Sequence, residues 1–548
     1  MKAITFRTFE RVHSWTGLLA GLALFIAFYA GAFTMFHEQT EDWQALPQPQ
    51  AAAESHERAW ADANQLLQSV TKQYPEARTE VGLTLPHGEL TEVQAWWFDG
   101  KVWQYRTPEQ MTSATPTAAS ADEEESTDLA HFIYGLHYSL GIPIVGIYLM
   151  GVVSIIYGLA LVTGLILYLP GFTKDLFTLR VGRNLKRLWQ DAHNVIGVLS
   201  LPFHVMFAIT GAIFCLSAVL VSALNFVVFK GELVDAFGRA TGFSDVVEPR
   251  GIPAATMLTP QEAVERAREA VRQKGGEDFD AAYVRYKQYG DQTAIVEAMG
   301  DSEGALASYG GVALSAVDGR VLNMQTAGAR DANHATYSAL FGLHFGHYGK
   351  LTLRWVYFVL GLSGAFLFYS GNLLWVESRR NRRGPTQTQG SYVMARSTVG
   401  VCLGTCVGVS ATFIATLIAG AFGMKSNGVV APVFFTVLAA SVAWAFYRMP
   451  SRAAADLLAA AAIATAAVPA IELTLVALGL RPSYFAAGSV AFAVAIVALL
   501  LATGFGLLAR ATARRAANGD PNSVWTGARP RTRPQSSPRV LEPSAENR

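Results

Sequence analysis

Residues 13–36 read HSWTGLLAGLALFIAFYAGAFTMF, an uncharged run that opens on a histidine. At about 1.5 Å per residue, a helix over its apolar part, 14–36, crosses the roughly 30 Å of hydrocarbon in a bilayer. Seven more apolar stretches of comparable length follow, at 142–169, 195–229, 353–376, 398–423, 429–447, 454–480 and 484–509. The sequence therefore predicts a membrane all-α helical bundle with about eight transmembrane helices.

Positive charge gathers in alternate connections between these spans. Lys and Arg residues cluster at 2–11, 174–187, 379–383, 448–452 and 510–515. By the positive-inside rule, this pattern predicts cytoplasmic termini and places the polar stretches 37–130 and 230–333 on the outer side. The formal net charge of the 548-residue chain is only +1, so the charge balance gives no indication of binding to nucleic acid.

The first four spans contain an internal duplication. One offset of 180 residues aligns the first span with the third, and one offset of 207 residues aligns the second with the fourth. The aligned pairs are His13 with His193, Gly17 with Gly197, Gly31 with Gly211, His137 with His344, and Gly164 with Gly371. Residues 1–170 and 190–376 therefore read as two parallel copies of a helix, a polar domain and a returning helix.

Each polar stretch reads as a small α+β domain. The first combines a helix at 55–74 with strand-like runs at 78–84, 91–98 and 101–106. The second opens a helix at Thr259-Pro260, where proline suits the first helical position, and strand-like runs follow at 282–288, 292–298 and 310–315. The last four spans lie outside the duplication.

Four of the 11 histidines occupy repeat-matched helix ends, namely His13, His193, His137 and His344. Duplicated helices are expected to meet around their shared axis, so each matched pair is expected to face across it. Two imidazoles on opposite sides of an apolar cleft can supply both axial ligands of a haem iron. Glycines near them would let a flat macrocycle approach the helices closely. One such site at each membrane face would form an electron route across the bilayer.

Other interpretations of these histidines stay open at this point. A histidine at a membrane interface can simply reach toward water as a snorkelling polar residue. His204, about three turns inside the third span, can ligate a haem, relay a proton or bond across helices. His347, one turn after His344, can replace it as a ligand or contact a haem propionate. His37, His56, His87, His131 and His334 read as surface or juxtamembrane residues.

Copper or zinc fits this distribution less well, because such an ion needs three or four ligands converging at one place. The chain also shows no G-x-G-x-x-G fingerprint for a flavin or nicotinamide nucleotide at a strand–helix junction. Reducing equivalents would therefore come from another source, such as a quinol or a cytoplasmic reductase.

At these positions the chain resembles the PepSY-associated transmembrane helix family, which includes iron-regulated membrane proteins and ferric-siderophore reductases. The resemblance covers about residues 1–380 and includes a PepSY-like domain in each half. The matching motifs are Arg11-x-His13-x-Trp15-x-Gly17, Leu136-His137, Thr163-Gly164, Asp191-x-His193-x-x-x-Gly197, Thr210-Gly211 and Leu343-His344-Phe345-Gly346.

The resemblance implies a multi-pass protein of the bacterial inner membrane that carries two haem b groups and reduces a ferric siderophore in the periplasm to release iron. It implies haem ligation by His13, His137, His193 and His344, and it leaves His204 open. The smaller reductases of the family lack the four C-terminal helices, so both the substrate and the direction of electron flow stay open.

The expected organisation follows from the spans, the duplication and this resemblance. In chain order it comprises a first transmembrane helix at 1–36, a periplasmic PepSY-like domain at 37–130, a second helix at 131–170, a basic cytoplasmic loop at 171–190, a third helix at 191–229, a second PepSY-like domain at 230–333, a fourth helix at 334–378, a cytoplasmic loop at 379–397, four more helices at 398–510 and a disordered cytoplasmic tail at 511–548.

Two other functions remain open from the sequence. The PepSY-like domains could bind a periplasmic protein or peptide with the helices serving only as an anchor. The C-terminal helices could instead form the path of a metal or siderophore permease.

Overall fold

The computed structural model describes most of the chain. The described residues are 3–45, 52–85, 93–112, 129–171, 180, 184–233, 242–244, 248–276, 279–302, 304–381, 387–424, 428–482, 489–518 and 522–526. Of the predicted disordered tail at 511–548, residues 511–518 instead continue the last helix, Val490–Asn518, and 522–526 are also described, whereas the remaining residues lie outside these ranges.

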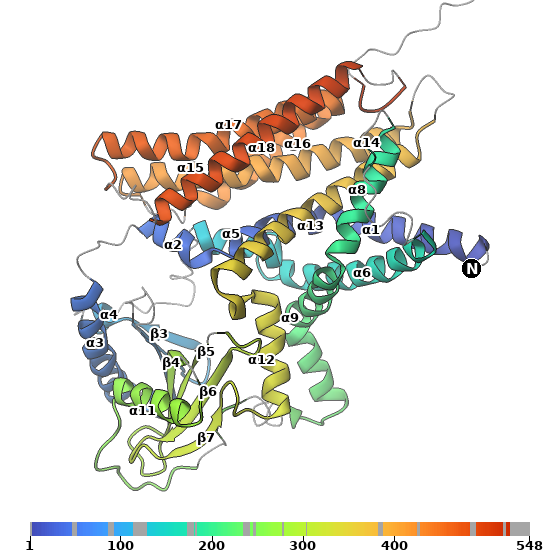
Figure 1. Ribbon diagram of the computed structural model, residues 1–548. Coiled ribbons are helices and arrows are strands. Elements are labelled where there is room, and N and C mark those ends of the chain that lie inside the picture. Colours follow the sequence, from blue (N-terminus) through green and yellow to red (C-terminus); the bar gives the residue numbers. More distant parts are fainter. Residues whose placement is uncertain are drawn as a thin grey trace, which may run out of the picture.

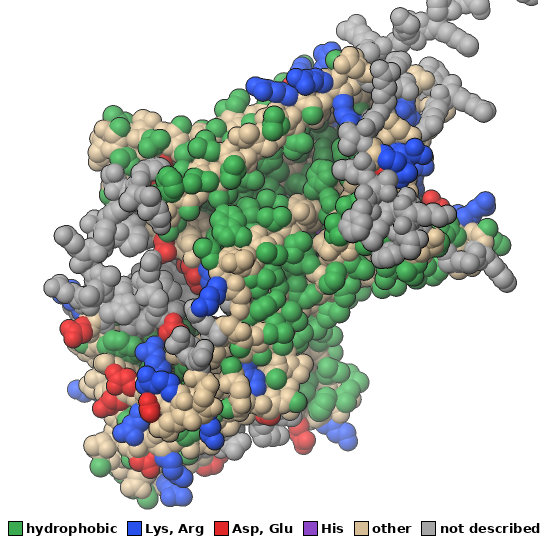
Figure 2. All heavy atoms as spheres, in the orientation of Figure 1, with side chains coloured by type: hydrophobic (Ala, Val, Ile, Leu, Met, Phe, Trp, Pro, Cys, Tyr) green, Lys and Arg blue, Asp and Glu red, His purple; other side chains and the backbone are tan. Residues whose placement is uncertain are grey.

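In the described ranges, eight helices are long and apolar enough to cross a membrane, which confirms the predicted number, and the chain is a multi-pass membrane protein. They are α1 (Ala3–Thr34), α6 (Val145–Tyr168), α9 (Leu201–Val227), α13 (Lys350–Ser378), the continuous run of α14 (Gln389–Thr398), η4 (Val399–Leu403) and α15 (Gly404–Ala421), then α16 (Val430–Tyr447), α17 (Pro450–Ala477) and α18 (Val490–Asn518). Figure 2 shows hydrophobic side chains over the helical part, with charged side chains gathered on the sheet and at helix ends.

Three of the first four spans are broken, where the sequence predicts single helices. The second consists of α5 (Leu129–Ser139) and α6, the third of α8 (Leu185–Leu199) and α9, and the fourth of α12 (Ala332–Phe345), η3 (His347–Gly349) and α13. Pro143 lies between α5 and α6, and Pro202 lies at the start of α9. A proline has no backbone N–H and clashes with the preceding turn, which explains the first two breaks.

The strands of both polar stretches form one antiparallel sheet rather than two separate domains. Its order is β3-β2-β1-β4-β5-β6-β7, built from β1 (Glu80–Thr84), β2 (Gln94–Phe98), β3 (Trp103–Arg106), β4 (Phe279–Lys287), β5 (Ile295–Ser302), β6 (Tyr309–Ser315) and β7 (Val321–Gln325). β1 pairs with β4, so Gly82 lies opposite Arg285. This pairing covers two edges that would otherwise expose unpaired backbone groups.

Two amphipathic helices close one side of this sheet. α3 (Ala52–Gln73), which η1 (Pro75–Arg78) follows, contacts β1 and β2, and α11 (Pro260–Gln273) contacts β4, β5 and β6. The short α4 (Pro108–Thr112) packs against α3. Apolar residues from both polar stretches share a single core, in which Leu67 and Val284 are fully buried. The sheet is therefore one structural unit contributed by the two halves of the chain.

The buried carboxylate of Glu297 lies in an ionic cluster within this sheet. Its oxygens lie 2.6 Å from a guanidinium nitrogen of Arg285 and 3.0 Å from Nζ of Lys287. Ser244 Oγ donates a hydrogen bond to the same carboxylate over 2.6 Å. Burial alone would raise the pKa of Glu297, but the two cations outweigh it and hold the pKa below its usual value. Arg285 also pairs with Glu80 of β1 at 3.4 Å, which links the strands of the two halves.

The C-terminal helices α15 to α18 form a bundle that lies on the opposite side of the first four spans from the sheet (Figure 1). A buried contact joins this bundle to α2 (His37–Ala45). Trp43 Nε1 donates to a carboxylate oxygen of Glu472 over 3.1 Å, and Arg481 Nε lies 3.2 Å from the other oxygen. Arg481 also donates to the backbone carbonyl of Trp43 and lies over its ring at 5.1 Å. The bundle is therefore docked on the first half of the chain through a defined polar contact.

Candidate functional site

The four repeat-matched histidines form two pairs. His13 on α1 faces His193 on α8, with ring centroids 6.2 Å apart. His137 on α5 faces His344 on α12, with ring centroids 6.0 Å apart. Each pair joins one histidine from each half of the chain, which is the pairing expected from the duplication.

The two pairs lie at opposite ends of the helical core. α12, which carries His344, contacts β6 of the sheet, so His137 and His344 are called the sheet-end pair. His13 and His193 are called the far pair. His137 contacts α1 beside Gly31, which is 18 residues after His13. That separation corresponds to about 27 Å along a helix axis, close to the thickness of the hydrocarbon core.

Hydrogen bonds fix both rings of the far pair. His13 Nδ1 donates to the backbone carbonyl of Ala160 on α6 over 2.9 Å. His193 Nδ1 donates to the carbonyl of Leu367 on α13 over 3.2 Å. A carbonyl oxygen can only accept, so in each neutral ring Nδ1 carries the proton and Nε2 carries the lone pair that can bind a metal. Leu367 follows Ala160 by the same 207 residues that relate the second and fourth spans.

The sheet-end pair is held in the same tautomer. His137 Nδ1 donates to the carbonyl of Ala27 on α1 over 2.8 Å. His344 Nδ1 lies 2.7 Å from Thr210 Oγ1 on α9. The Thr210 hydroxyl already donates its proton to the carbonyl of Met206 over 2.8 Å, so it accepts from the histidine. All four Nε2 atoms are therefore available as ligands.

Three glycines make room for the rings. A Cβ atom on Gly164 would lie 2.8 Å from Cε1 of His13, and one on Gly371 would lie 3.1 Å from Cε1 of His193. A Cβ atom on Gly31 would lie 2.5 Å from Nδ1 of His137. Glycines near the histidines were expected to let a macrocycle approach, whereas these three make room for the imidazole rings themselves. Gly17, one turn after His13, faces open space instead.

The spacing within each pair suits an iron ion between the two rings. A metal–imidazole bond of roughly 2 Å on each side, added to about 1.2 Å from Nε2 to each ring centre, places the centroids roughly 6.4 Å apart. The observed values are 6.2 Å for the far pair and 6.0 Å for the sheet-end pair. In each pair, the distance between the two rings therefore fits one haem iron between the imidazoles.

A cavity of about 480 Å³ contains the sheet-end pair. Its lining residues are Phe28, Gly31, Thr34, Met35, His37, Glu38, Tyr134, His137, Phe203, Phe207, Tyr283, His344, Phe345, Arg354, Tyr357 and Gly361. Most are aromatic or apolar, as in cofactor sites. Arg354 supplies a cation to the lining and pairs with Glu38 at 3.0 Å. Tyr283 comes from β4, so the cavity extends to the sheet.

An ion pair lies two residues before His193. Asp191 is buried, and Arg180 reaches one of its oxygens at 2.6 Å and the other at 2.8 Å. The pair joins Arg180 to α8 next to the far pair.

His204 belongs to neither pair. It is fully buried, and its Nδ1 lies 2.5 Å from the hydroxyl of Tyr157. Its ring contacts Phe28 at 5.6 Å, and Phe28 contacts Phe207 at 6.0 Å. Phe207 in turn lies 4.9 Å from His344. His204 therefore lies in an aromatic cluster that leads toward the sheet-end pair.

Two further sets of residues bear on the sequence predictions. The backbone of His347 forms part of η3, but its side chain lies outside the described part of the structure. His37 and His131, which were predicted to be surface or juxtamembrane residues, lie together with ring centroids 5.2 Å apart, and His37 lines the cavity. The sequence signal for His37 was its spacing from Glu41, which lies one helical turn later.

Tyr157 and Thr210, which hydrogen-bond the rings of His204 and His344, were not predicted as ring partners. Their role depends on packing between helices, which the sequence does not show.

Comparison with known proteins identifies the first two thirds of the chain. The family described as PepSY-associated TM region matches residues 10–378. The matched region ends where α13 ends, so the C-terminal bundle lies outside it. Uncharacterized protein PA4219 of Pseudomonas aeruginosa is 26% identical over 280 residues, which are 50% of this chain and 68% of that protein.

Proposed function

The chain belongs to the PepSY-associated transmembrane family, and on that premise we propose that it is an inner-membrane di-haem b protein that reduces a ferric siderophore. In this proposal the far pair faces the cytoplasm and the sheet faces the periplasm, as the distribution of Lys and Arg favours. The observation that carries the proposal is the spacing and the shared tautomer of the two imidazole pairs.

The repetition of the contacts supports one symmetric site at the far pair, to which each half of the chain contributes one ligand. The acceptors for His13 and His193 are related by the same offset as the helices that carry them. Gly164 and Gly371, which make room for these two rings, obey that offset too. In each half, a histidine, its carbonyl acceptor and the glycine that makes room for its ring therefore recur together, as expected of two ligands that face each other in one site.

Within this proposal, the protein's own residues perform three tasks. The carbonyl and hydroxyl acceptors hold the proton of each imidazole on Nδ1 and leave the lone pair on Nε2 for a metal, which preorganises the ligands. Phe28 packs against Phe207 and Phe368 in the region between the two histidine pairs. This packing excludes water from that region. Arg354 offers a cation at the cavity for a propionate group. A haem held by these residues would supply one-electron transfer.

The substrate is proposed from the chemistry of iron. Siderophores hold Fe(III) through hard oxygen donors, which bind Fe(II) far less well, so the addition of one electron loosens the complex. The cavity at the sheet-end pair extends to Tyr283 of β4. The ferric siderophore is therefore proposed to reach the sheet-end pair from the side of the sheet. A quinol or a cytoplasmic reductase would supply the electron at the far pair.

Single-site variants of the purified full-length protein test this proposal. His137→Ala is expected to remove one haem per chain and leave the far site loaded, and His13→Ala is expected to do the reverse. His334→Asn serves as a control, because His334 bonds Asp331 and the carbonyl of Gly242 outside both pairs. A colourless folded preparation would overturn the proposal and favour a non-enzymatic binding protein or a permease.

A further inference from the structure

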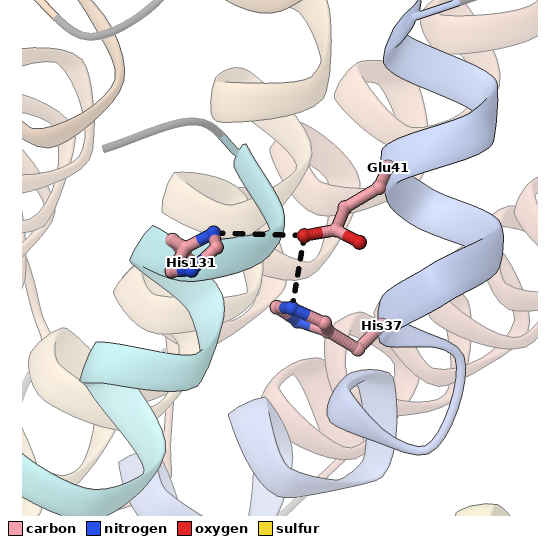
Figure 3. Close-up of side chains that lie close together, drawn as sticks. All are labelled: His37, Glu41 and His131. Carbon is pink, nitrogen blue, oxygen red and sulfur yellow. Dashed lines mark ion pairs between the residues drawn. The ribbon is translucent and has the colours of Figure 1, made fainter. Parts of the chain in front are cut away.

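A second cluster of metal-binding side chains lies outside both histidine pairs. Figure 3 shows His37 and Glu41 on one helix and His131 on another, with their polar atoms directed toward one another. His37 Nε2 lies 3.1 Å and His131 Nδ1 lies 3.6 Å from the same oxygen, Oε1 of Glu41. One donor atom from each residue lies within 4.8 Å of the other two. No other group of three such side chains meets this closely in the described ranges.

The fold brings these residues together without relying on the cluster itself. His37 and Glu41 are four residues apart on α2 and therefore share a face of that helix. His131 lies in the first turn of α5, which packs against α2. The side chain of Gln44 accepts a hydrogen bond from the backbone N–H of Leu129 over 3.0 Å, which ties the start of α5 to the end of α2. The three donor groups are therefore positioned by their helices.

We propose that His37, Glu41 and His131 form a binding site for a divalent first-row transition-metal ion. Two imidazoles and one carboxylate are the donor set of non-haem ferrous sites, which leave further positions open. A tetrahedral ion with bonds of about 2.0–2.1 Å holds its ligand atoms roughly 3.3 Å apart. Two of the three spacings, 3.1 Å and 3.6 Å, lie near that value, so a small rotation of the imidazoles completes the site.

The cluster is open enough for an ion to enter from solution. The side chains of His37, His131 and Glu41 are 30%, 48% and 28% exposed. Coordination positions not filled by the protein therefore face water. A site of this kind can take an ion from another ligand and give it up again, unlike a closed structural site.

The location connects this site with the proposed reduction. His37 lines the cavity that contains His137 and His344. His131 precedes His137 by six residues on α5, which is about 9 Å along the helix axis. On the premise of the proposed function, the occupant is Fe²⁺ released from the reduced complex. In this step the ion exchanges chelator oxygens for two nitrogens and one carboxylate oxygen, with no change in its oxidation state.

Equilibrium dialysis of the full-length protein in detergent tests the site, with Co²⁺ as the probe. Cobalt per chain, measured by elemental analysis, does not overlap with haem iron. We expect one Co²⁺ per chain, bound at least tenfold more weakly in His131→Ala and in Glu41→Gln. Glu57→Gln, on the exposed surface of α3, is the matched control and is expected to bind as the wild type does. No bound cobalt, or equal binding in every variant, would overturn the site.

Haem content measured on the same samples separates this inference from the proposed function. Two haems per chain with no bound cobalt would overturn the triad alone. Bound cobalt without haem would overturn the reductase and the assignment of Fe²⁺, while the metal site itself would stand. Isotopically labelled ferrous iron, added without oxygen, is expected to match cobalt in stoichiometry and in its loss from the variants. Labelled iron that binds equally in all variants would contradict the ferrous assignment.

Discussion

The rings of His137 and His344 face each other with centroids 6.0 Å apart, although they come from α5 and α12 in different halves of the chain. Nδ1 of His137 donates a hydrogen bond to the carbonyl of Ala27 on α1, and Nδ1 of His344 donates one to the hydroxyl of Thr210 on α9. Four helices therefore converge on one pair of nitrogen atoms. This convergence is difficult to explain by packing alone and is expected of a ligand site.

Removing the acceptor behind His344 is expected to weaken one haem site selectively. Thr210→Val keeps the side-chain shape but leaves the Nδ1–H of His344 without its partner, so the ring loses its fixed tautomer. The loss of such a partner lowers metal affinity about 10- to 100-fold. The affinity of the sheet-end site for haem is therefore expected to fall about 10- to 100-fold. Apo-myoglobin added in excess takes up the haem that this site releases, and the change in absorbance measures the release.

The control for this variant is Thr503→Val on α18, whose hydroxyl bonds only its own helix at Leu499 in the described structure. Its haem retention is expected to equal that of the wild type. Equal loss from both variants would mean that threonine removal acts through general stability and not through His344.

A methyl group at Gly31 is expected to displace His137. Alanine normally favours a helix by about 1 kcal/mol over glycine, so a harmful Gly31→Ala must act through its surroundings. Its Cβ would lie 2.5 Å from Nδ1 of His137, whereas a Cβ on Gly135 would meet nothing within 4 Å. Gly31→Ala is expected to lose the sheet-end haem and Gly135→Ala to retain both, as counted by haem per chain. Full loading of both variants would contradict the geometry.

Acid is expected to destabilise the sheet through Glu297. The pKa of this carboxyl is lowered in the folded protein, so its contribution to stability is complete above the unfolded value of about 4.3 and declines as the pH falls further. Glu297→Gln leaves Arg285 and Lys287 without their buried partner, which costs about 3 kcal/mol at neutral pH.

Thermal unfolding midpoints between neutral and acidic pH measure both effects. The wild type is expected to lose stability below the unfolded pKa, and Glu297→Gln to start lower and depend less on pH in that range. Glu57→Gln on the surface of α3 should follow the wild type. A variant as stable as the wild type at neutral pH would show that the buried cluster contributes nothing.

The C-terminal bundle is expected to depend on its buried ion pair. Glu472→Gln weakens the pairing of Arg481, whose side chain is only 8% exposed, and is expected to cost about 3 kcal/mol. Asp456→Asn removes a similar pair with Arg448 whose side chains are 38% and 36% exposed, and is expected to cost under about 1 kcal/mol. Comparison of the thermal midpoints tests this ranking. Equal shifts would contradict the docking role of the buried pair.

The offsets in the sequence predicted which rings face each other, because an offset of 180 residues aligns His13 with His193 and an offset of 207 residues aligns His137 with His344. The merged sheet was not predictable in this way. The β1–β4 pairing joins Glu80 to Lys287, and strand-like runs give no information about partners so distant in the chain. The cluster of His37 and His131 likewise depends on how α2 packs against α5, a contact that no local pattern encodes.

The haem content of the purified, full-length wild-type protein tests the central claim most directly. Two haem b groups per chain, with a dithionite-reduced spectrum of the bis-imidazole type, are the predicted result. A folded protein that binds no haem when haem is supplied would contradict the account, because neither imidazole pair would then serve as a ligand site.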